Sequence, residues 1–339
     1  MGKDRLNRNI AIAILAMGLA GCSTTGAPPK EVIERSTLGA AIPVASEDSG
    51  WKLVWQDEFD GTEVDRSKWD FDINCWGGGN NERQCYTGRW ANARVKDGKL
   101  TITAIKENWR GFALPEHMRI TEEEKKSFKV QPFTSARLVT RGKAAWKYGR
   151  IEVRAKLPQG QGTWPAIWML PEDNAYGTWA ASGEIDIMEA INLGVPCAKC
   201  PGGVENEIAG TLHFGGLWPD NSLHSTRLHY PKVLDGFHTF GVIWEPDRMI
   251  WTVNGRVFAE KRPEDWFTTN SDEARAPFDK PFHLILNFAV GGKWPEEEGV
   301  GGLDQTGFPK TFEIDYVRVW QCGDGLADAA NCTGEGAGE

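Results

Sequence analysis

Short apolar runs, many alternating with polar residues, recur from residue 51 to residue 321. Gly, Pro, Asn or Asp bounds nearly every run, which is typical of short β-strands joined by turns. The predicted strands are 51–59, 98–105, 135–142, 149–158, 183–189, 208–214, 237–246, 248–261 (a hairpin), 282–290 and 312–321. Because helical patterns do not separate these strands, they predict an all-β fold, a sandwich or jelly roll of two packed antiparallel sheets.

Two dipeptides predict tight hairpin turns. Asn254-Gly255 and Asp97-Gly98 both lie between apolar runs and suit a turn whose central residues have positive φ. Helical patterns are confined to two short segments. Residues 121–128 are highly charged and predict a solvated surface helix, and residues 263–267 predict one further helical turn.

The first residues differ in pattern from the remainder of the chain. Lys3, Arg5 and Arg8 precede an apolar run at 10–20, which is too short to span a bilayer. A basic start followed by a short apolar run is typical of an export signal.

A possible lipid anchor follows this run. Residues 19–22 spell Leu-Ala-Gly-Cys and resemble the lipobox of bacterial lipoproteins, in which cleavage leaves the cysteine as a lipidated first residue. The alternative is a plain secretory signal with an incidental cysteine. We expect a signal peptide over 1–21, a lipid on Cys22 and a flexible tether over 22–50. These features predict an exported protein anchored at the bacterial cell envelope, and Ser23 favours the outer membrane.

Six further cysteines predict disulfides, because an even number in an exported chain usually pairs. Local closure favours the pairs Cys75–Cys85, Cys197–Cys200 and Cys322–Cys332, although six cysteines permit fifteen connectivities. The spacing of Cys197 and Cys200 also suits zinc. No second CxxC and no suitably placed pair of histidines accompanies it, so zinc is the weaker alternative.

Charge and composition narrow the class of ligand. A net charge of −9 does not favour binding of nucleic acid or anionic membrane through the surface field. The chain has 16 Trp but only 5 Tyr. Indole rings suit both a sandwich core and a surface that stacks on sugars. Part of the Trp content therefore indicates a carbohydrate ligand.

Residues 182–190, Ser-Gly-Glu-Ile-Asp-Ile-Met-Glu-Ala, place three carboxylates in one apolar strand. Residues two apart share a face of a strand, so Glu184 and Asp186 lie opposite the isoleucines. Strict alternation would turn Glu189 into the core, where an unpaired carboxylate is costly. One extra residue near 187–188, a β-bulge, returns Glu189 to the acidic face.

Such a row suits hydrolysis of a glycosidic bond, which needs one ionised and one protonated carboxyl group. Neighbouring like charges raise the pKa of at least one member. Along a bulged strand the Cα atoms of Glu184 and Glu189 lie about 13 Å apart. Two glutamates that lean inward close this to about 5 Å, the separation of a retaining enzyme. A calcium site or a solvated acidic edge is the alternative.

The stretch at 183–189 resembles the E-x-D-x-x-E signature of glycoside hydrolase family 16. Other stretches resemble bacterial laminarinases of that family: WQDEFDG at 55, NNERQCYT at 80, NARVKDGKLTITA at 92, YGRIEVRAKLP at 148, WPAIWMLP at 164, TLHFGG at 211, NFAVGGKWP at 287 and IDYVRVWQ at 314. We therefore expect a catalytic domain over 51–321 and a C-terminal tail over 322–339. The resemblance implies a jelly roll with a cleft across its concave sheet and retaining hydrolysis of β-glucans.

The resemblance also implies roles for individual residues. Glu184 matches the nucleophile, Glu189 the general acid/base and Asp186 an assisting carboxylate. The residues that match sugar-binding positions are Trp179, Trp164, Asn80, Glu82, Arg150, His213 and Trp218. A core position for Trp164, an ordinary strand charge for Arg150 and a structural His213 are the alternatives.

Catalysis by this family implies no cofactor. A structural calcium distant from the cleft is implied at Glu58, Gly98 and Asp315, through main-chain and carboxylate oxygens. The alternative is no metal, with Asp315 paired to a base.

The predicted function is that of an endo-1,3-β-glucanase acting on laminarin-type β-glucan, as a monomer tethered to a membrane. The segments at 105–134 and 191–210 are longer than a minimal laminarinase needs. They leave mixed-linkage β-glucan and a red-algal galactan open as alternative substrates. An alternative of another class is a non-catalytic glycan-binding lipoprotein. The presence of both Glu184 and Glu189 disfavours it.

Overall fold

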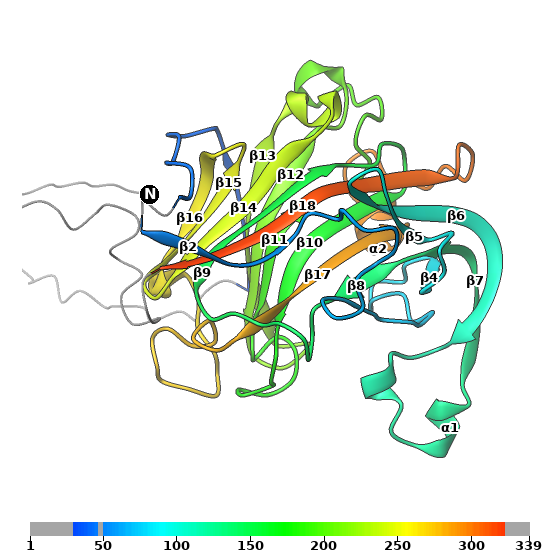
Figure 1. Ribbon diagram of the computed structural model, residues 1–339, viewed down its shortest axis with the longest axis horizontal. Coiled ribbons are helices and arrows are strands. Elements are labelled where there is room, and N and C mark those ends of the chain that lie inside the picture. The colour runs from blue at the N-terminus through cyan, green and yellow to red at the C-terminus, as the bar shows by residue number, and fades with distance from the viewer. Residues whose placement is uncertain (1–29, 47–49, 323–339) are drawn as a thin grey trace, which may run out of the picture.

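Two β-sheets pack face to face in the computed structural model, which describes residues 30–46 and 50–322 (Figure 1). The eight-stranded sheet has the spatial order β1 (Glu31–Ser36), β13 (Asn221–His229), β12 (Glu207–Gly215), β11 (Glu184–Glu189), β10 (Thr163–Pro171), β17 (Phe282–Val290), β8 (Arg137–Val139) and β3 (Asp70–Phe71). The two-sheet sandwich predicted from the strand pattern is confirmed.

The ten-stranded sheet covers one side of the first. Its order is β16 (Arg256–Lys261), β15 (Arg248–Val253), β14 (His238–Glu245), β9 (Gly149–Lys156), β18 (Lys310–Cys322), β6 (Lys99–Phe112), β7 (Phe128–Ser135) and β4 (Gln84–Tyr86), with β2 (Trp51–Asp57) on β18 and β5 (Ala93–Lys96) on β6. Strand pairs are antiparallel except β1–β13 and β4–β7, which are parallel.

Helices are few and short in the part of the chain that the structure describes. The α-helices are α1 (Glu122–Lys125) and α2 (Lys293–Glu297), and 3-10 turns cover Glu116–Met118, Pro201–Gly203, Pro231–Asp235 and Pro263–Asp265. The turn expected at 263–267 is confirmed. Within residues 30–46 and 50–322, no helix has the length and apolar character needed to cross a membrane.

The hydrophobic core fills the space between the sheets, because inward-facing residues alternate along most strands. In β9, for example, Ile151, Val153 and Ala155 are all fully buried. Both predicted hairpin turns form: φ is 49° at Asn254 and 68° at Gly255, and the Asp97-Gly98 turn has the same signs. These positive φ values are what the Asn-Gly and Asp-Gly pairs tolerate.

The insertion at 105–134 forms a long two-stranded arm from β6 and β7, with α1 near its tip (Figure 1). The helix predicted over 121–128 is therefore shorter than expected. It ends at Lys125, and Phe128 already belongs to β7. Phe128 stacks on Phe112 of the partner strand, with ring centroids 5.1 Å apart, and this pairing favours strand over helix at the end of the ladder next to the tip.

The expected tether over 22–50 is wrong for its second half, because residues 30–46 pack on the domain. β1 pairs with β13 over six residues. The chain then crosses to the other sheet, where Gly39 N donates to Val257 O at 2.7 Å and Ile42 N to Gly255 O at 2.8 Å. The N-terminal segment therefore joins the edge strands of both sheets.

A buried lysine fixes this segment. Lys261 of β16 has a side chain only 5% exposed, and its Nζ lies 2.6 Å from Glu34 Oε2 and 2.7 Å from His224 Nε2. The hydrogen bond from Lys261 holds the pKa of Glu34 below its ordinary value. Glu34 thus supplies the negative charge that a buried ammonium group requires.

We predict that Glu34→Ala lowers the free energy of unfolding at pH 7 by about 1–2 kcal/mol, less than for a fully buried pair because Glu34 is half-exposed. A carboxylate with a lowered pKa stabilises the fold above its unfolded-state pKa and loses this effect as the pH falls through its folded-state pKa. The difference from wild type should therefore narrow on acidification in urea titrations. Glu31→Ala on the same strand is the control, and equal stability of the two variants at pH 7 would contradict the assignment.

Candidate active site

The three carboxylates of β11 share one face of the eight-stranded sheet, which we call the acid face. Asp186 pairs with Thr211 and Glu189 with Ala209, so β11 advances three residues where β12 advances two. The extra residue is the predicted bulge. Ile187 and Met188 both enter the core between the sheets, so Glu189 returns to the side of Glu184 and Asp186.

Trp251 of the other sheet supports this irregularity from below. Its Nε1 donates to the main-chain oxygen of Asp186 at 2.8 Å, which satisfies a buried carbonyl beside the bulge. Gly210 lies opposite the bulge on β12. A Cβ there would meet Trp251 Cδ1 at 2.5 Å, so only glycine lets the indole approach this closely.

Burial dominates the electrostatics of the row. It raises the pKa of Glu184 to about 8, and the neighbouring Asp186 adds to this increase while His213 opposes it. Burial and the charge of Glu189 raise the pKa of Asp186 well above its ordinary value. Burial likewise raises the pKa of Glu189. The row therefore retains protons at neutral pH and does not carry three negative charges.

Each of the two glutamates accepts a hydrogen bond from its own indole. Trp179 Nε1 donates to Glu184 Oε2 at 2.7 Å, and Trp164 Nε1 donates to Glu189 Oε1 at 2.8 Å. Each bond fixes the direction of one carboxyl group. The structure thus places both predicted tryptophans directly against the acids, with Trp179 still 37% exposed.

His213 faces the same row. Its Nε2 lies 3.3 Å from Asp186 Oδ2 and 3.7 Å from Glu184 Oε1. Trp218 is 73% exposed and adjoins this group, because its main-chain N donates to Trp179 O at 3.2 Å. Both residues therefore lie at the Glu184 end of the row, whereas the resemblance implied a position of His213 near the acid/base, Glu189.

Asn80 and Glu82 lie in the loop closed by the Cys75–Cys85 disulfide. Asn80 is exposed, and its main-chain oxygen accepts from Lys293 N at 2.8 Å. Glu82 is buried, and its Oε2 accepts from Gln84 Nε2 at 2.6 Å and from Tyr86 OH at 3.3 Å. Asn80 is thus open to a ligand, while Glu82 is held inside the protein.

The prediction that Arg150 lies in the cleft is wrong. It lies on β9 of the other sheet, where alternation directs it away from the core and from the acid face. Its guanidinium donates to Glu152 and, at 2.7 Å, to Pro43 O of the N-terminal segment. The resemblance identified the strand motif, but motif alone does not show which sheet the strand joins.

The acid face carries an arginine that the sequence analysis missed. Arg137 of β8 pairs in register with Asn287 of β17, which in turn pairs with Ala166 beside Glu189. Trp168 Nε1 donates to Asn287 Oδ1 at 2.6 Å, and the Arg137 guanidinium lies 4.6 Å from the Trp168 ring centroid. The available signal was Asn287, a polar residue inside the apolar run 282–290.

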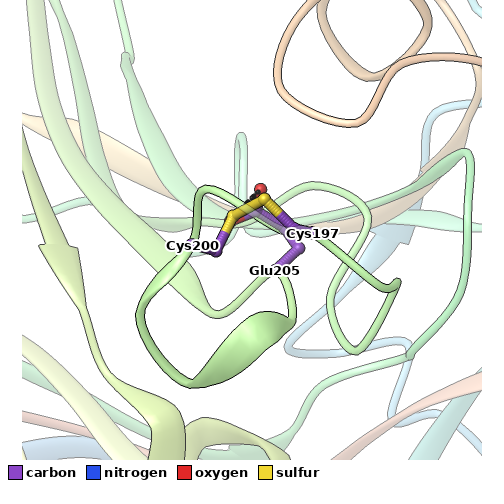
Figure 2. Close-up of side chains that lie close together, drawn as sticks. All are labelled: Cys197, Cys200 and Glu205. Atoms are coloured by element: carbon purple, nitrogen blue, oxygen red, sulfur yellow. Dashed lines mark hydrogen bonds between the residues drawn. A yellow bond between two sulfur atoms is a disulfide. The ribbon is translucent and has the colours of Figure 1, made fainter.

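The cysteines in the loop after β11 are oxidised. Cys197 and Cys200 form a disulfide beside Glu205, as Figure 2 shows, and Cys75 pairs with Cys85. Disulfide sulfurs are not thiolate ligands, so the zinc alternative for this CxxC fails. Cys322 is also disulfide-bonded. Its predicted partner, Cys332, lies outside the described residues.

The side chains expected to bind calcium have other partners. Glu58 accepts two hydrogen bonds from Arg318, at 2.8 and 2.9 Å, and Asp315 is paired with Arg154. Calcium prefers carboxylates that are free to coordinate it. These two carboxylates as arranged do not fit such a site, and calcium binding stays a prediction that rests on main-chain oxygens such as that of Gly98.

Comparisons with known proteins agree with this geometry. The model of the family described as glycosyl hydrolases family 16 matches residues 105–318. Glucan endo-1,3-beta-glucosidase of Cryptopygus antarcticus is 40% identical over 276 residues, 80% of this chain and 92% of its own. The X-ray structure of the laminarinase from Rhodothermus marinus has a TM-score of 0.65 at 38% identity, with 81% of this chain and 98% of that chain covered.

One relative is much longer than this chain. Glucan endo-1,3-beta-glucosidase A1 of Niallia circulans is 38% identical over 312 residues, which are 87% of this chain but 41% of that protein. The family match at residues 105–318 includes β11, the strand that carries the three acids. This chain therefore belongs to glycosyl hydrolases family 16 and is a glycoside hydrolase.

Proposed function

We propose that this protein is a retaining endo-hydrolase of β-1,3-glucan. The observation that carries the proposal is the bulge in β11, which brings Glu184 and Glu189 to one face with a separate indole donor on each. Two carboxyl groups on one face of a short strand suit the narrow separation of a double displacement. Enzymes of this family need no catalytic cofactor.

In the first step, Glu184 attacks the anomeric carbon as a carboxylate, which its pKa of about 8 makes the minor form at neutral pH, while protonated Glu189 donates its proton to the departing glycosidic oxygen. Burial and the charge of Glu189 raise the pKa of Asp186, and a protonated Asp186 places no negative charge beside the nucleophile Glu184. The Trp179 Nε1 donor acts in the same direction. Glu189, with its raised pKa, retains the proton that the leaving group needs.

In the second step, Glu189 has become a carboxylate and removes a proton from water, which attacks the anomeric carbon and releases Glu184. The sugar leaves with its original anomeric configuration, and the acid returns to its protonated form. His213 lies beside Asp186 and Glu184 in both steps, where it can stabilise negative charge on the carboxylate of Glu184.

The linkage preference is the finer part of the proposal. The β-1,3 assignment is supported by the laminarinase and endo-1,3-beta-glucosidase relatives. Release of reducing ends from laminarin, lichenan, agarose and carrageenan tests it. Faster hydrolysis of laminarin is expected, and a preference for lichenan or a galactan would replace the assignment.

We also propose that the protein is exported and anchored through a lipid on Cys22. The connection between the lipid and the folded domain would then be short. Residues 23–29 are all that separate Cys22 from Lys30, the first described residue. This distance allows at most about 30 Å of extended chain. The domain would therefore lie close to the bilayer surface, with β1 as the first strand after the connection.

Glu184→Gln and Glu189→Gln should each lower kcat on laminarin by at least about 10³-fold, because each step needs a carboxyl group that the amide cannot replace. Neither should lower the melting temperature, since an amide removes the cost of ionising a buried carboxyl. Glu152→Gln on the opposite sheet is the control.

Azide separates the two roles. With an aryl β-1,3-oligoglucoside whose leaving group needs no protonation, it should restore turnover in the variants Glu184→Ala and Glu189→Ala, giving an α-glycosyl azide from the first and a β-glycosyl azide from the second. Near-wild-type activity of either glutamine variant, or the reverse azide products, would contradict the roles.

His213→Asn should move the whole pH profile of kcat/KM to higher pH. Protonated His213 lowers the pKa of Glu184 and of Glu189, so its loss raises both. The rate rises as Glu184 ionises and falls as Glu189 loses its proton, and both limbs therefore shift in the same direction. His229→Asn is the matched control on the same face, and an unchanged or acid-shifted profile for His213→Asn would refute this role.

Cys22→Ser should release the protein from membranes when it is produced in a bacterium that processes lipoproteins. Partition of extracts between detergent-rich and aqueous phases measures this. The natural chain should enter the detergent phase and the variant the aqueous phase. Recovery of both in the aqueous phase would show an export signal without an anchor.

A further inference from the structure

We propose that β1 belongs to the substrate-binding surface and that its acid-face residues hold the outer sugars of a β-glucan chain. This inference rests on the proposed function and extends it. β1 is the outermost strand of the sheet that carries the catalytic acids. The strand order β11, β12, β13, β1 is continuous, so its outward side chains lie on the acid face.

Strand register aligns β1 with the catalytic row residue by residue. Three rows cross the four strands: Glu184–His213–Leu223–Glu31, Asp186–Thr211–Ser225–Ile33, and Glu189–Ala209–Arg227–Arg35. Adjacent strands are about 4.8 Å apart, so β1 lies about 14 Å from the acids. A glucan chain that crosses the sheet from the cleaved bond toward this edge would reach β1 with its outer sugars.

The row that runs from Asp186 to Ile33 is suited to a sugar at its Ile33 end. Thr211 and Ser225 are small and bond to each other, with Thr211 Oγ1 2.9 Å from Ser225 Oγ. Ile33 follows them, and 49% of its surface is exposed. An exposed apolar side chain beside small neighbours offers a contact for the C–H face of a pyranose ring.

Charged groups flank this position and suit sugar hydroxyls. Glu207 accepts from Arg35 at 3.2 Å and from Arg227 at 3.5 Å, while Arg35 remains 64% exposed. A guanidinium has five N–H donors, so Arg35 retains donors for a ligand while bound to Glu207. The clamp between Glu34 and Lys261, on the opposite face of β1, holds the strand before substrate arrives.

Length dependence of hydrolysis tests the inference. The probes are β-1,3-linked glucose oligosaccharides from the trisaccharide to the heptasaccharide, and laminarin, with Ile33→Asp, Ile33→Trp and the control Val44→Asp. Val44 is 81% exposed in the same N-terminal segment but lies outside β1. Melting temperature is measured for each variant.

Ile33→Asp should raise KM for the longest substrates about threefold or more, and Ile33→Trp should lower it, because one removes and the other enlarges an apolar contact. For the trisaccharide, both variants should equal wild type in kcat/KM. A merely structural role would change all lengths alike. Identical KM values for wild type and both variants on long chains would overturn the inference, and so would equal changes at every length. If the wild type cleaves no β-1,3-oligosaccharide, the proposed function fails first, and the subsite fails with it.

Discussion

The bulge between Asp186 and Glu189 is the constraint on which the rest of the site depends. A regular strand with Glu184 and Asp186 on the acid face would place Glu189 in the core and Met188 on the acid face. The extra residue allows Ile185, Ile187 and Met188 to enter the core while all three carboxylates share the opposite face. The cost is a disrupted ladder, and Trp251 and Gly210 offset it by satisfying the Asp186 carbonyl and filling the space beneath the bulge.

The same arrangement explains why the acids are poised for chemistry. Burial raises the pKa of every carboxyl in the row, which destabilises the fold as the pH rises but leaves protons in place for acid catalysis. Each glutamate receives one indole donor, from Trp179 or Trp164, and His213 lowers the pKa of both. The site therefore combines a cost in stability with carboxyl groups whose pKa values are raised toward the range that acid catalysis needs.

Sequence reasoning reached much of this structure because alternation, turn chemistry and the expense of burying Glu189 are local effects. It predicted β2, β9, β11, β12 and β17 among the strands, together with the Asn254-Gly255 turn and the bulge itself, but it gave no strand for β7, β10 or β13. It failed where pairing across the sheet decides the outcome. Arg150 and Arg137 occupy similar strand positions in the sequence, and only the assignment of β9 and β8 to different sheets separates them. The six residues of β1 were missed because an edge strand pairs on one side only and buries few side chains, so its alternation of apolar and polar residues is weak.

The stereochemistry of hydrolysis tests the central claim most directly, because it reports the separation of the two glutamates. Proton NMR of a β-1,3-linked oligosaccharide digest, recorded before mutarotation, distinguishes the first anomer released. If the bulge brings Glu184 and Glu189 within about 5 Å, the β-anomer appears first and the α-anomer follows slowly. Initial release of the α-anomer would place a water between more distant carboxylates and contradict the geometry described for β11.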